Sequence, residues 1–306
     1  MIRKTILTFT LCLVALAIGA QSLYVGSYNI RNKNADDAGK GNAWEQRGPV
    51  LAKQIEFEHP DIFGTQEVLK EQLDDLEAWL PEYDHIGVGR EDGVHGGEHE
   101  AIFYDHNRLR LIDHGDFWLS ETPDRPGLGW DAACTRICTW GCFKDSKSKM
   151  KFFFFNLHMD HVGIVARREA AKLVVSRIAE IAQGKPVMLT GDFNVDQTNE
   201  IYSTFTTSPL LKDSYEHARV RFAENGTYNA FDPDLKTESR IDHIFVSPAF
   251  IVERYAVMTN CYWTPTALSG KKQKGKDAPQ EIDFARYERR LPSDHYPVFA
   301  RLRLQK

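Results

Sequence analysis

The chain has 306 residues, of which 42% are hydrophobic, 26% are charged and 11% are aromatic. These proportions exclude a disordered or fibrous chain and indicate a globular protein that can bury a sizeable core. The formal net charge is −5. The molecule as a whole therefore has no electrostatic attraction to nucleic acid or other polyanions, and only a local basic patch would supply one.

The first twenty residues have the layout of a cleaved secretory signal. Arg3 and Lys4 precede an uncharged, mostly apolar stretch over residues 6–17, and small residues follow it. That stretch is short for a membrane span and ends as a signal cleavage site does. We therefore expect residues 1–20 to be removed and the protein to be exported to the periplasm or the extracellular space. The alternative is an uncleaved anchor.

The spacing of apolar residues predicts alternating strands and helices along the rest of the chain. Residues 44–58, 70–80 and 167–183 have the periodicity of amphipathic helices. Runs rich in β-branched and aromatic residues predict strands at residues 23–30, 61–67, 85–89, 134–143, 151–157, 187–190, 241–246 and 296–304. This alternation favours an α/β fold in which helices cover layers of strands, formed by one domain over residues 21–306. We expect exposed loops at the Gly-rich residues 92–97 and the Lys/Gly-rich residues 269–276.

Three cysteines, Cys134, Cys138 and Cys142, are spaced four residues apart on one of the expected strands. Positions four apart on a strand are separated by about 13 Å, so neighbouring members of this set cannot form disulfides with each other. A disulfide would need a partner elsewhere, such as Cys261. We expect the three to be buried packing residues rather than metal ligands.

Polar clusters interrupt or close six of the apolar runs. They are Ser27-Tyr28-Asn29-Ile30, Gln66-Glu67, Asn156-Leu157-His158-Met159-Asp160, Gly191-Asp192-Phe193-Asn194, Arg240-Ile241-Asp242-His243 and Ser293-Asp294-His295. Taken singly, each is explained by a turn that closes a strand or by a solvated charge. Together they indicate an active site built on strand ends.

The residue types in these clusters suit metal-assisted hydrolysis of a phosphoester. A hard cation such as Mg²⁺ prefers oxygen ligands, and Glu67 with the neighbouring amide of Asn29 supplies them. Asp192 can deprotonate water, and Asn194 lies on the same side as a neutral donor.

Three histidines lie inside the clusters: His158, His243 and His295. A carboxylate such as Asp242 can fix the tautomer of His295 and raise its pKa, although a buried structural histidine is the alternative for each. The pair His158 and His161 lacks the helical spacing and the third soft ligand of a dedicated zinc site. The sequence also lacks the Gly-x-x-x-x-Gly-Lys-Ser/Thr loop of nucleotide-driven motors and the Gly-x-Ser-x-Gly motif of serine hydrolases.

In their order along the chain, the six clusters resemble the motifs of the endonuclease/exonuclease/phosphatase superfamily. The resemblance runs from about residue 23 to residue 304 and implies a four-layered α/β sandwich, with two packed, mostly antiparallel β-sheets flanked by helices. It also implies that Glu67 binds the catalytic Mg²⁺ or Mn²⁺, with Asn29 and Asp294 close to the metal.

The same resemblance implies catalytic roles for five residues. Asp192 would orient or deprotonate the attacking water, Asn194 would contact the scissile phosphate, and His295, partnered by Asp242, would bind the phosphate or assist proton transfer. His158 resembles the histidine that the nuclease and sphingomyelinase branches place against the phosphate, where the abasic-site endonuclease branch has tyrosine. This difference, together with the expected export, disfavours a role in DNA repair.

Residues 117–123 and 129–132 resemble a little-characterised secreted bacterial branch whose motifs fix no substrate. We take Arg240, Tyr228 and Trp130 as candidate substrate-binding residues, with Trp263 as a further aromatic that is able to stack on a ring. For these aromatic residues, packing in the core is the alternative.

These inferences predict an exported phosphoester hydrolase that uses Mg²⁺ or Mn²⁺ and in-line attack of water. The expected substrate is a nucleic acid, a phospholipid headgroup, or a sugar or inositol phosphate, acted on by a monomer with no obligate protein partner. A nuclease would require Arg136, Arg167, Arg168 and the lysines of residues 271–276 to converge. A sphingomyelinase-like lipid hydrolase would require an exposed apolar hairpin, and residues 269–276 contain no aromatic side chain. The third alternative is a catalytically silent binding module that keeps the same fold.

Overall fold

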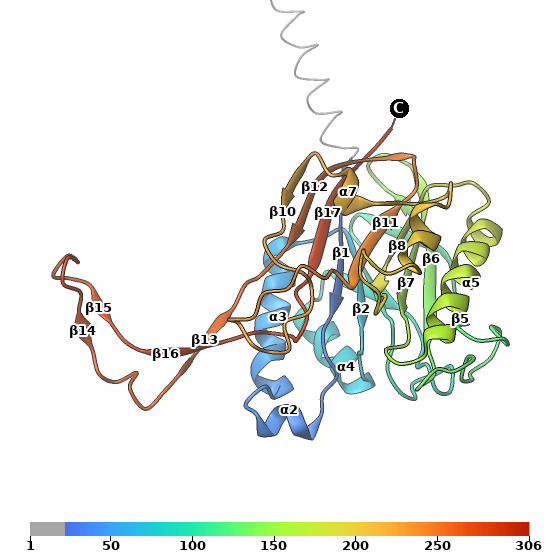
Figure 1. Cartoon of the computed structure of the whole chain (residues 1–306). Coiled ribbons are helices and arrows are strands. Elements are labelled where there is room, and N and C mark those ends of the chain that lie inside the picture. The colour runs from blue at the N-terminus through green and yellow to red at the C-terminus, as the bar shows by residue number, and fades with distance from the viewer. Residues whose placement is uncertain (1–21, 306) are drawn as a thin grey trace, which may run out of the picture.

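Figure 1 shows the computed structural model of the chain, which describes residues 22–305. The expected signal, residues 1–20, lies outside the described residues. Among the residues that are described, no helix is long and apolar enough to cross a membrane.

Two mixed β-sheets form the centre of the molecule. The first has seven strands in the order β10 (Val220–Phe222), β12 (Phe250–Val257), β17 (Val298–Leu304), β1 (Ser22–Asn29), β2 (Ile62–Gln66), β4 (Ile102–Asp105) and β3 (Tyr83–Ile86). The second has six strands in the order β5 (Leu109–Trp118), β6 (Ile137–Asp145), β7 (Lys151–His158), β8 (Val187–Asp192), β11 (Asp242–Val246) and β9 (Lys212–Asp213). Pairs β1–β2, β7–β8 and β10–β12 are parallel, and the other neighbours within these two sheets are antiparallel.

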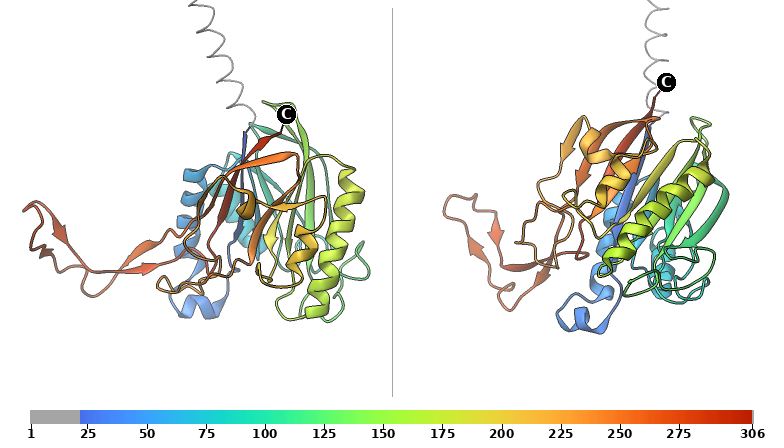
Figure 2. Two further views of the ribbon diagram at one scale, coloured as in Figure 1. Left: turned by 45° about the horizontal axis from the view of Figure 1, so that its top comes forward. Right: turned by 45° about the vertical axis from the view of Figure 1, so that its right-hand side comes forward.

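Helices cover the outer face of each sheet (Figures 1 and 2). On the seven-stranded sheet lie α3 (Trp44–Glu58) and α4 (Lys70–Trp79), and on the six-stranded sheet lie α5 (Ile164–Ala182) and the short α6 (Tyr202–Thr206). Two further short helices are α2 (Ala35–Gly39) and α7 (Ser214–His217). The expected four-layered α/β sandwich is confirmed.

Three apolar clusters hold the four layers together. One fills the space between the sheets, where Val25 of β1 and Phe154 of β7 are fully buried. The others lie between each sheet and its helices. On α5, Ala170, Val174 and Ile178 recur every four residues and form the buried stripe that the sequence predicts.

The topology brings the polar strand ends to one edge of the sandwich. Strands β1 and β2 are parallel, so Asn29 and Gln66 end side by side, and β7 and β8 place His158 opposite Asp192 in the same way. Strand β11 runs antiparallel to β8 and starts there, with Asp242 paired to Asp192. Strand β17 is antiparallel to β1, so the segment that precedes it also lies at this edge.

A hairpin arm over residues 262–290 extends away from the sandwich (Figures 1 and 2). Strands β13 (Tyr262–Pro265) and β16 (Tyr287–Arg290) form its base, and β14 (Gln273–Lys274) and β15 (Asp283–Phe284) form its outer part. At the base, Arg290 donates to the backbone oxygen of Lys40 over 3.0 Å. Only an exposed loop was expected, at residues 269–276, and the hairpin arm corrects that expectation.

The cysteines differ in part from the sequence-based expectation. Strand β6 begins at Ile137, so Cys134 precedes it and is only partly buried, whereas Cys138 and Cys142 are buried on the strand. These three residues and Cys261 are all free thiols.

Candidate active site

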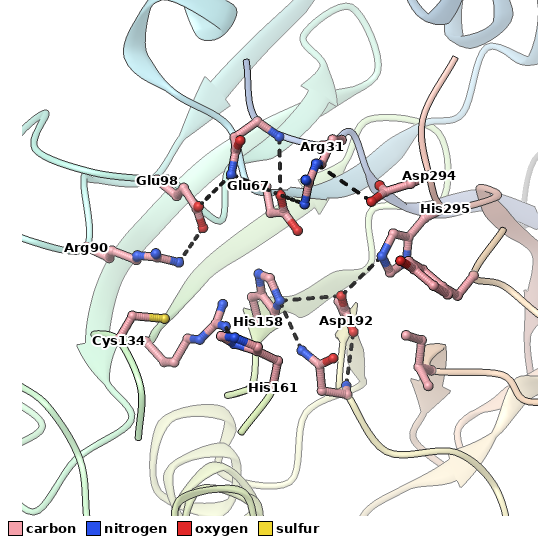
Figure 3. Close-up of a pocket in the computed structure, with 15 residues that line it drawn as sticks. Arg31, Glu67, Arg90, Glu98, Cys134, His158, His161, Asp192, Asp294 and His295 are labelled. Carbon is pink, nitrogen blue, oxygen red and sulfur yellow. Dashed lines mark hydrogen bonds and ion pairs between the residues drawn. The ribbon is translucent and has the colours of Figure 1, made fainter. Parts of the chain in front are cut away.

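A cavity of about 380 Å³ opens at the sheet edge where the polar strand ends meet (Figure 3). Most of its lining is charged or can form hydrogen bonds. The lining residues are Arg31, Asn32, Glu67, Arg90, Glu98, Cys134, Arg136, His158, His161, Asp192, Asn194, Tyr228, Ile241, Asp294 and His295. This cavity is the candidate active site.

Two carboxylates, Glu67 and Asp294, lie on either side of Arg31 at one corner of the cavity (Figure 3). The guanidinium lies 3.7 Å from an oxygen of each. The Asn29 side chain donates to Glu67 over 3.0 Å. Burial alone would raise the pKa of Glu67, but this hydrogen bond and the charge of Arg31 hold it below the ordinary value. Burial and the negative charge of Glu67 raise the pKa of Asp294.

The backbone directs Glu67 into this corner. Its φ of 63° is in the left-handed region, immediately after β2 ends at Gln66. Non-glycine residues adopt this region rarely, and such strain concentrates at functional sites. Two buried carboxylates and an amide oxygen are the oxygen donors that a hard divalent cation prefers, and such an ion would replace the Arg31 guanidinium as their positive partner. The corner is therefore a candidate metal site.

Asp192 and His295 form the second part of the site. His295 Nδ1 lies 2.8 Å from Asp242, and its Nε2 lies 3.7 Å from Asp192. Burial alone would lower the pKa of His295, but the charges of Asp242 and Asp192 raise it well above the ordinary value. Burial, as the larger cause, and repulsion by the Asp242 carboxylate together raise the pKa of Asp192 to about 7. A carboxyl group with a pKa near neutrality is suited to general base catalysis.

His158 and Asn194 complete the arrangement around Asp192. The Asn194 amide nitrogen lies 3.2 Å from His158 Nε2 and donates to the backbone oxygen of Met159 over 2.9 Å. His158 Nε2 also lies 3.4 Å from Asp192. Burial, together with the charges of Arg136 and Arg90, lowers the pKa of His158 well below its ordinary value, which favours the neutral ring. Asn194 has a φ of 50° and, like Glu67, turns back at a strand end.

Residues 26–295 match the Endonuclease/Exonuclease/phosphatase family. The chain belongs to this family. The resemblance that the six clusters carry is thereby confirmed, and the chain is a phosphoesterase of the endonuclease/exonuclease/phosphatase family.

Two solved structures from Bacteroides thetaiotaomicron are similar over almost the whole described chain. One is a family protein with 49% identity and a TM-score of 0.84, covering 93% of this chain and 98% of its own. The other is a mannosyl-6-phosphatase with 50% identity and a TM-score of 0.83, covering 92% and 99%. An uncharacterised protein of Acanthamoeba polyphaga mimivirus is 34% identical over 268 residues, which are 83% of this chain and 90% of that protein.

Most of the residues predicted from the six clusters of the endonuclease/exonuclease/phosphatase family come together in the structure. Those that line the cavity or contact a lining residue are Asn29, Glu67, His158, Asp192, Asn194, Asp242, Asp294 and His295. Tyr228 is also in the lining, with its ring centre 5.1 Å from that of His295. His243, in contrast, is buried against Phe193 and Phe245 and acts as a structural histidine.

Two of the candidate substrate-binding residues, Arg240 and Trp130, lie outside the cavity, which corrects their predicted role. The Arg240 guanidinium pairs with Asp213 over 2.9 Å and lies 3.7 Å from the centre of the Tyr215 ring, so it stabilises the fold outside the cavity. Trp130 packs against the apolar cluster beneath α5 and is absent from the lining. Trp263 is exposed on the hairpin arm.

Several charged residues of this site were not predicted from the sequence. Arg31, Arg90 and Glu98 line the cavity from loops, where a charged residue ordinarily indicates a solvated surface. Glu100 is fully buried behind His158, with one carboxyl oxygen 3.8 Å from Nδ1. Burial raises the pKa of Glu100 to about 8. For Glu98 and Glu100, the local signal in the sequence is the Gly-rich loop 92–97, which leads directly into them.

Proposed function

We propose that this chain is a divalent-metal-dependent phosphatase that releases phosphate from a phosphorylated sugar. One observation carries the proposal: Glu67, Asp192 and His295, from three distant parts of the sequence, meet at the edge of one compact cavity. The mannosyl-6-phosphatase at 50% identity supports the choice of substrate class.

The cavity residues divide the work of hydrolysis. Mg²⁺ or Mn²⁺, held by Glu67 with Asn29 and Asp294 beside it, would supply positive charge to the phosphoryl oxygens. Asp192 orients a water molecule and accepts its proton as the water oxygen attacks phosphorus in line with the leaving oxygen. Asn194 and neutral His158 contact the phosphoryl group. His295, kept cationic by Asp242 and Asp192, neutralises the charge that develops there.

The distribution of basic side chains favours a small substrate over a nucleic acid. Arg168 lies on α5 and pairs with Glu200, whereas the lysines of residues 271–276 lie on the outer part of the arm, on the opposite side of the molecule (Figures 1 and 2). Arg168 and these lysines do not converge with Arg136 in the cavity, whereas Arg167 donates to the backbone oxygen of Asp160, the partner of Arg136. A volume of about 380 Å³ lies within the range of small-molecule pockets.

A phospholipid headgroup is the second candidate substrate, and the hairpin arm is the observation that favours it. Trp263 and Tyr287 are exposed at the base of the arm, and Phe284 is exposed at its outer part, near the lysines of residues 271–276. An apolar and basic hairpin of this kind suits contact with an anionic lipid surface. Against a silent binding module stands the complete set of acidic and imidazole side chains around the cavity.

The deciding experiment is a substrate panel with the purified chain. After EDTA treatment, Mg²⁺ or Mn²⁺ is added back with mannose 6-phosphate, other hexose phosphates, inositol phosphates, DNA, RNA and sphingomyelin vesicles. We expect metal-dependent phosphate release from hexose phosphates and none from the Asp192→Ala variant. The control is Asp124→Ala, which removes a carboxylate whose side chain is 87% exposed outside the cavity. Full activity of Asp192→Ala would refute the assignment, and hydrolysis of sphingomyelin alone would establish the lipid alternative.

We also propose that the protein is exported after loss of residues 1–20 and acts as a monomer. The apolar stretch over residues 6–17 supports export. Expression of the full chain in a bacterial host, followed by fractionation, intact mass and light scattering, tests both points. A full-length cytoplasmic product would contradict export, and a stable dimer would contradict the monomer.

A further inference from the structure

One wall of the cavity has no part in the hydrolysis proposed above. Figure 3 shows Arg90, Glu98, Cys134 and His161 on the side of His158 that faces away from His295. Arg136, which immediately precedes β6, lines the same wall. The Asn32 side chain donates to both Glu98 and Glu67, so it joins this wall to the corner of Glu67 and Asp294.

Both arginines in this wall are fixed by hydrogen-bonded side chains, and each also has one buried donor without a partner among the described residues. The Arg90 guanidinium donates to Glu98, which also accepts from Asn32 over 3.0 Å. Arg136 Nη2 donates to His161 Nδ1 over 3.0 Å. Arg136 Nη1 and Arg90 Nε, in contrast, are buried and form no hydrogen bond within the described part of the chain.

Buried donors without partners are rare in native proteins and call for a specific explanation. Arg136 is only 4% exposed, so bulk water does not solvate its guanidinium. Because the residue lines the cavity, a bound ligand can supply the missing partner. The arrangement is held in place before a ligand arrives, since Asp160 lies 3.5 Å from Arg136 Nε and accepts the backbone N–H of Gly163 over 2.7 Å.

The wall offers donors and acceptors side by side. Glu98 is an acceptor next to the donor Arg90, and His161, whose Nδ1 accepts from Arg136, keeps its Nε2 as a donor. A sugar hydroxyl both donates and accepts, so neighbouring hydroxyls satisfy both kinds of group. A second phosphate only accepts, and the Glu98 carboxylate would repel it. A nucleobase would also lack a stacking platform among the residues described for this wall.

We infer that Arg136, Arg90, Glu98 and His161 form the leaving-group subsite, which binds the hydroxyls of a neutral polyol such as a hexose ring. The phosphate of the same substrate then lies in the cavity against Asp192, Asn194 and His295. This inference rests on the proposed phosphatase function and deepens it, since it assigns the residues that select the alcohol. Arg136 is a specificity-determining residue, because it contacts the part of the substrate that does not react.

The test compares two phosphomonoesters that differ in hydroxyls. Mannose 6-phosphate carries them on the leaving group, and phenyl phosphate carries none. Arg136→Met removes the guanidinium and keeps the apolar stem. We expect kcat/KM for mannose 6-phosphate to fall about tenfold or more, the usual effect of losing a hydrogen bond from a charged donor. For phenyl phosphate we expect a smaller loss, which arises because burial and also the Arg136 charge lower the pKa of His158 beside the phosphoryl group. Arg136→Lys, which keeps the charge, is expected to restore part of the discrimination.

Binding gives a readout that is independent of turnover of the sugar phosphate. Free mannose is expected to inhibit the hydrolysis of phenyl phosphate by the wild type and to inhibit the Arg136→Met variant more weakly. Arg168→Met on the surface of α5 is the matched control, because that arginine is absent from the lining. Unchanged far-ultraviolet circular dichroism and melting temperature would show that the variants are folded.

The outcomes separate this inference from the proposed function. Equal losses for both substrates would overturn the subsite and assign Arg136 to the phosphate. No loss for either substrate would also overturn the subsite. Hydrolysis of phenyl phosphate without hydrolysis of any hexose phosphate by the wild type would overturn the subsite and the sugar as substrate, and would leave only the metal-dependent phosphatase activity. Absence of metal-dependent hydrolysis of every phosphomonoester would overturn both proposals.

Discussion

His295 Nδ1 lies 2.8 Å from the Asp242 carboxylate, although 53 residues separate them in the sequence. Asp242 begins β11, and His295 lies three residues before β17, so the pairing joins the two sheets at the cavity. Asp242 fixes the tautomer of His295 and contributes to the raised pKa of that histidine.

We predict that Asp242→Asn lowers kcat by about 10² to 10⁴ while KM changes little, because the amide keeps the shape but loses the charge. The pKa of His295 should then fall, and the alkaline limb of the pH–rate profile should move to lower pH. A pH–rate profile of the variant against the wild type measures this change. An alkaline limb that stays in place would show that Asp242 has a structural role only.

The raised pKa of Asp192 predicts how activity depends on acid. Burial and the neighbouring Asp242 raise this pKa to about 7 in the metal-free protein. Only the ionised carboxylate accepts a proton from water, so kcat/KM should fall about tenfold for each unit of pH below the pKa. A bound cation nearby stabilises the carboxylate and should move this midpoint to lower pH.

The measurement is a pH–rate profile at low and at saturating Mg²⁺, with EDTA-treated protein as the inactive reference. The Asp192→Asn variant, which cannot ionise, should be inactive at every pH. A profile that is flat from about pH 5 to about pH 9 would contradict the role of Asp192 as the base.

The six strand-end clusters could be predicted from sequence because each breaks an apolar run that is itself visible. A polar residue that follows a buried strand is confined to the sheet edge, and the strand order then decides which ends meet. Glu67 and Asp192 were found in this way. Helix α3 was predicted with the bounds that the structure shows, because its apolar spacing is regular.

The residues that were not predicted from the sequence are positioned by side-chain pairs that leave no periodic signal in it. Arg90 is buried and Glu98 is half-buried, and the two side chains pair across the Gly-rich loop. Arg240 was misassigned because its partner Asp213 lies in a short, irregular segment that gives no periodic signal. Strand β12 was missed for a related reason, since its run is interrupted by charged side chains that remain partly exposed.

Glu100 provides a prediction about stability. Burial raises its pKa to about 8 from an ordinary 4.5, although Arg90 opposes the change. A carboxyl group whose pKa is raised by folding destabilises the folded protein as pH rises, here between about 4.5 and about 8. Glu100→Gln, which resembles the protonated acid, should therefore gain stability over the wild type as pH rises through this range, by about 1.4 kcal/mol for each pH unit.

Thermal unfolding of both proteins at several pH values tests this prediction. The difference in melting temperature should be small at about pH 5 and should favour the variant at about pH 9. A difference that does not vary with pH would show that Glu100 is ionised throughout or that the amide itself disturbs the packing.

Gly64 on β2 holds the two sheets close together beneath the cavity. An added Cβ would lie 2.6 Å from Thr190 Oγ1 and closer still to Asn156 Oδ1. Asn156 cannot move aside without loss, since it donates to Thr65 over 2.8 Å and accepts from Gln66 over 2.6 Å. Gly64→Ala should therefore separate β2 from β7 and β8 and destabilise the fold by about 1–3 kcal/mol.

The same separation should lower activity, because Glu67 follows β2 while Asp192 ends β8. Gly39→Ala is the matched control, since nothing lies within 4 Å of a Cβ added there, at the end of α2. Urea unfolding and kcat/KM at saturating metal should both change in Gly64→Ala and remain near wild type in Gly39→Ala. If Gly64→Ala were as stable and active as the wild type, the sheet spacing at Asn156 would not be what positions Glu67 relative to Asp192.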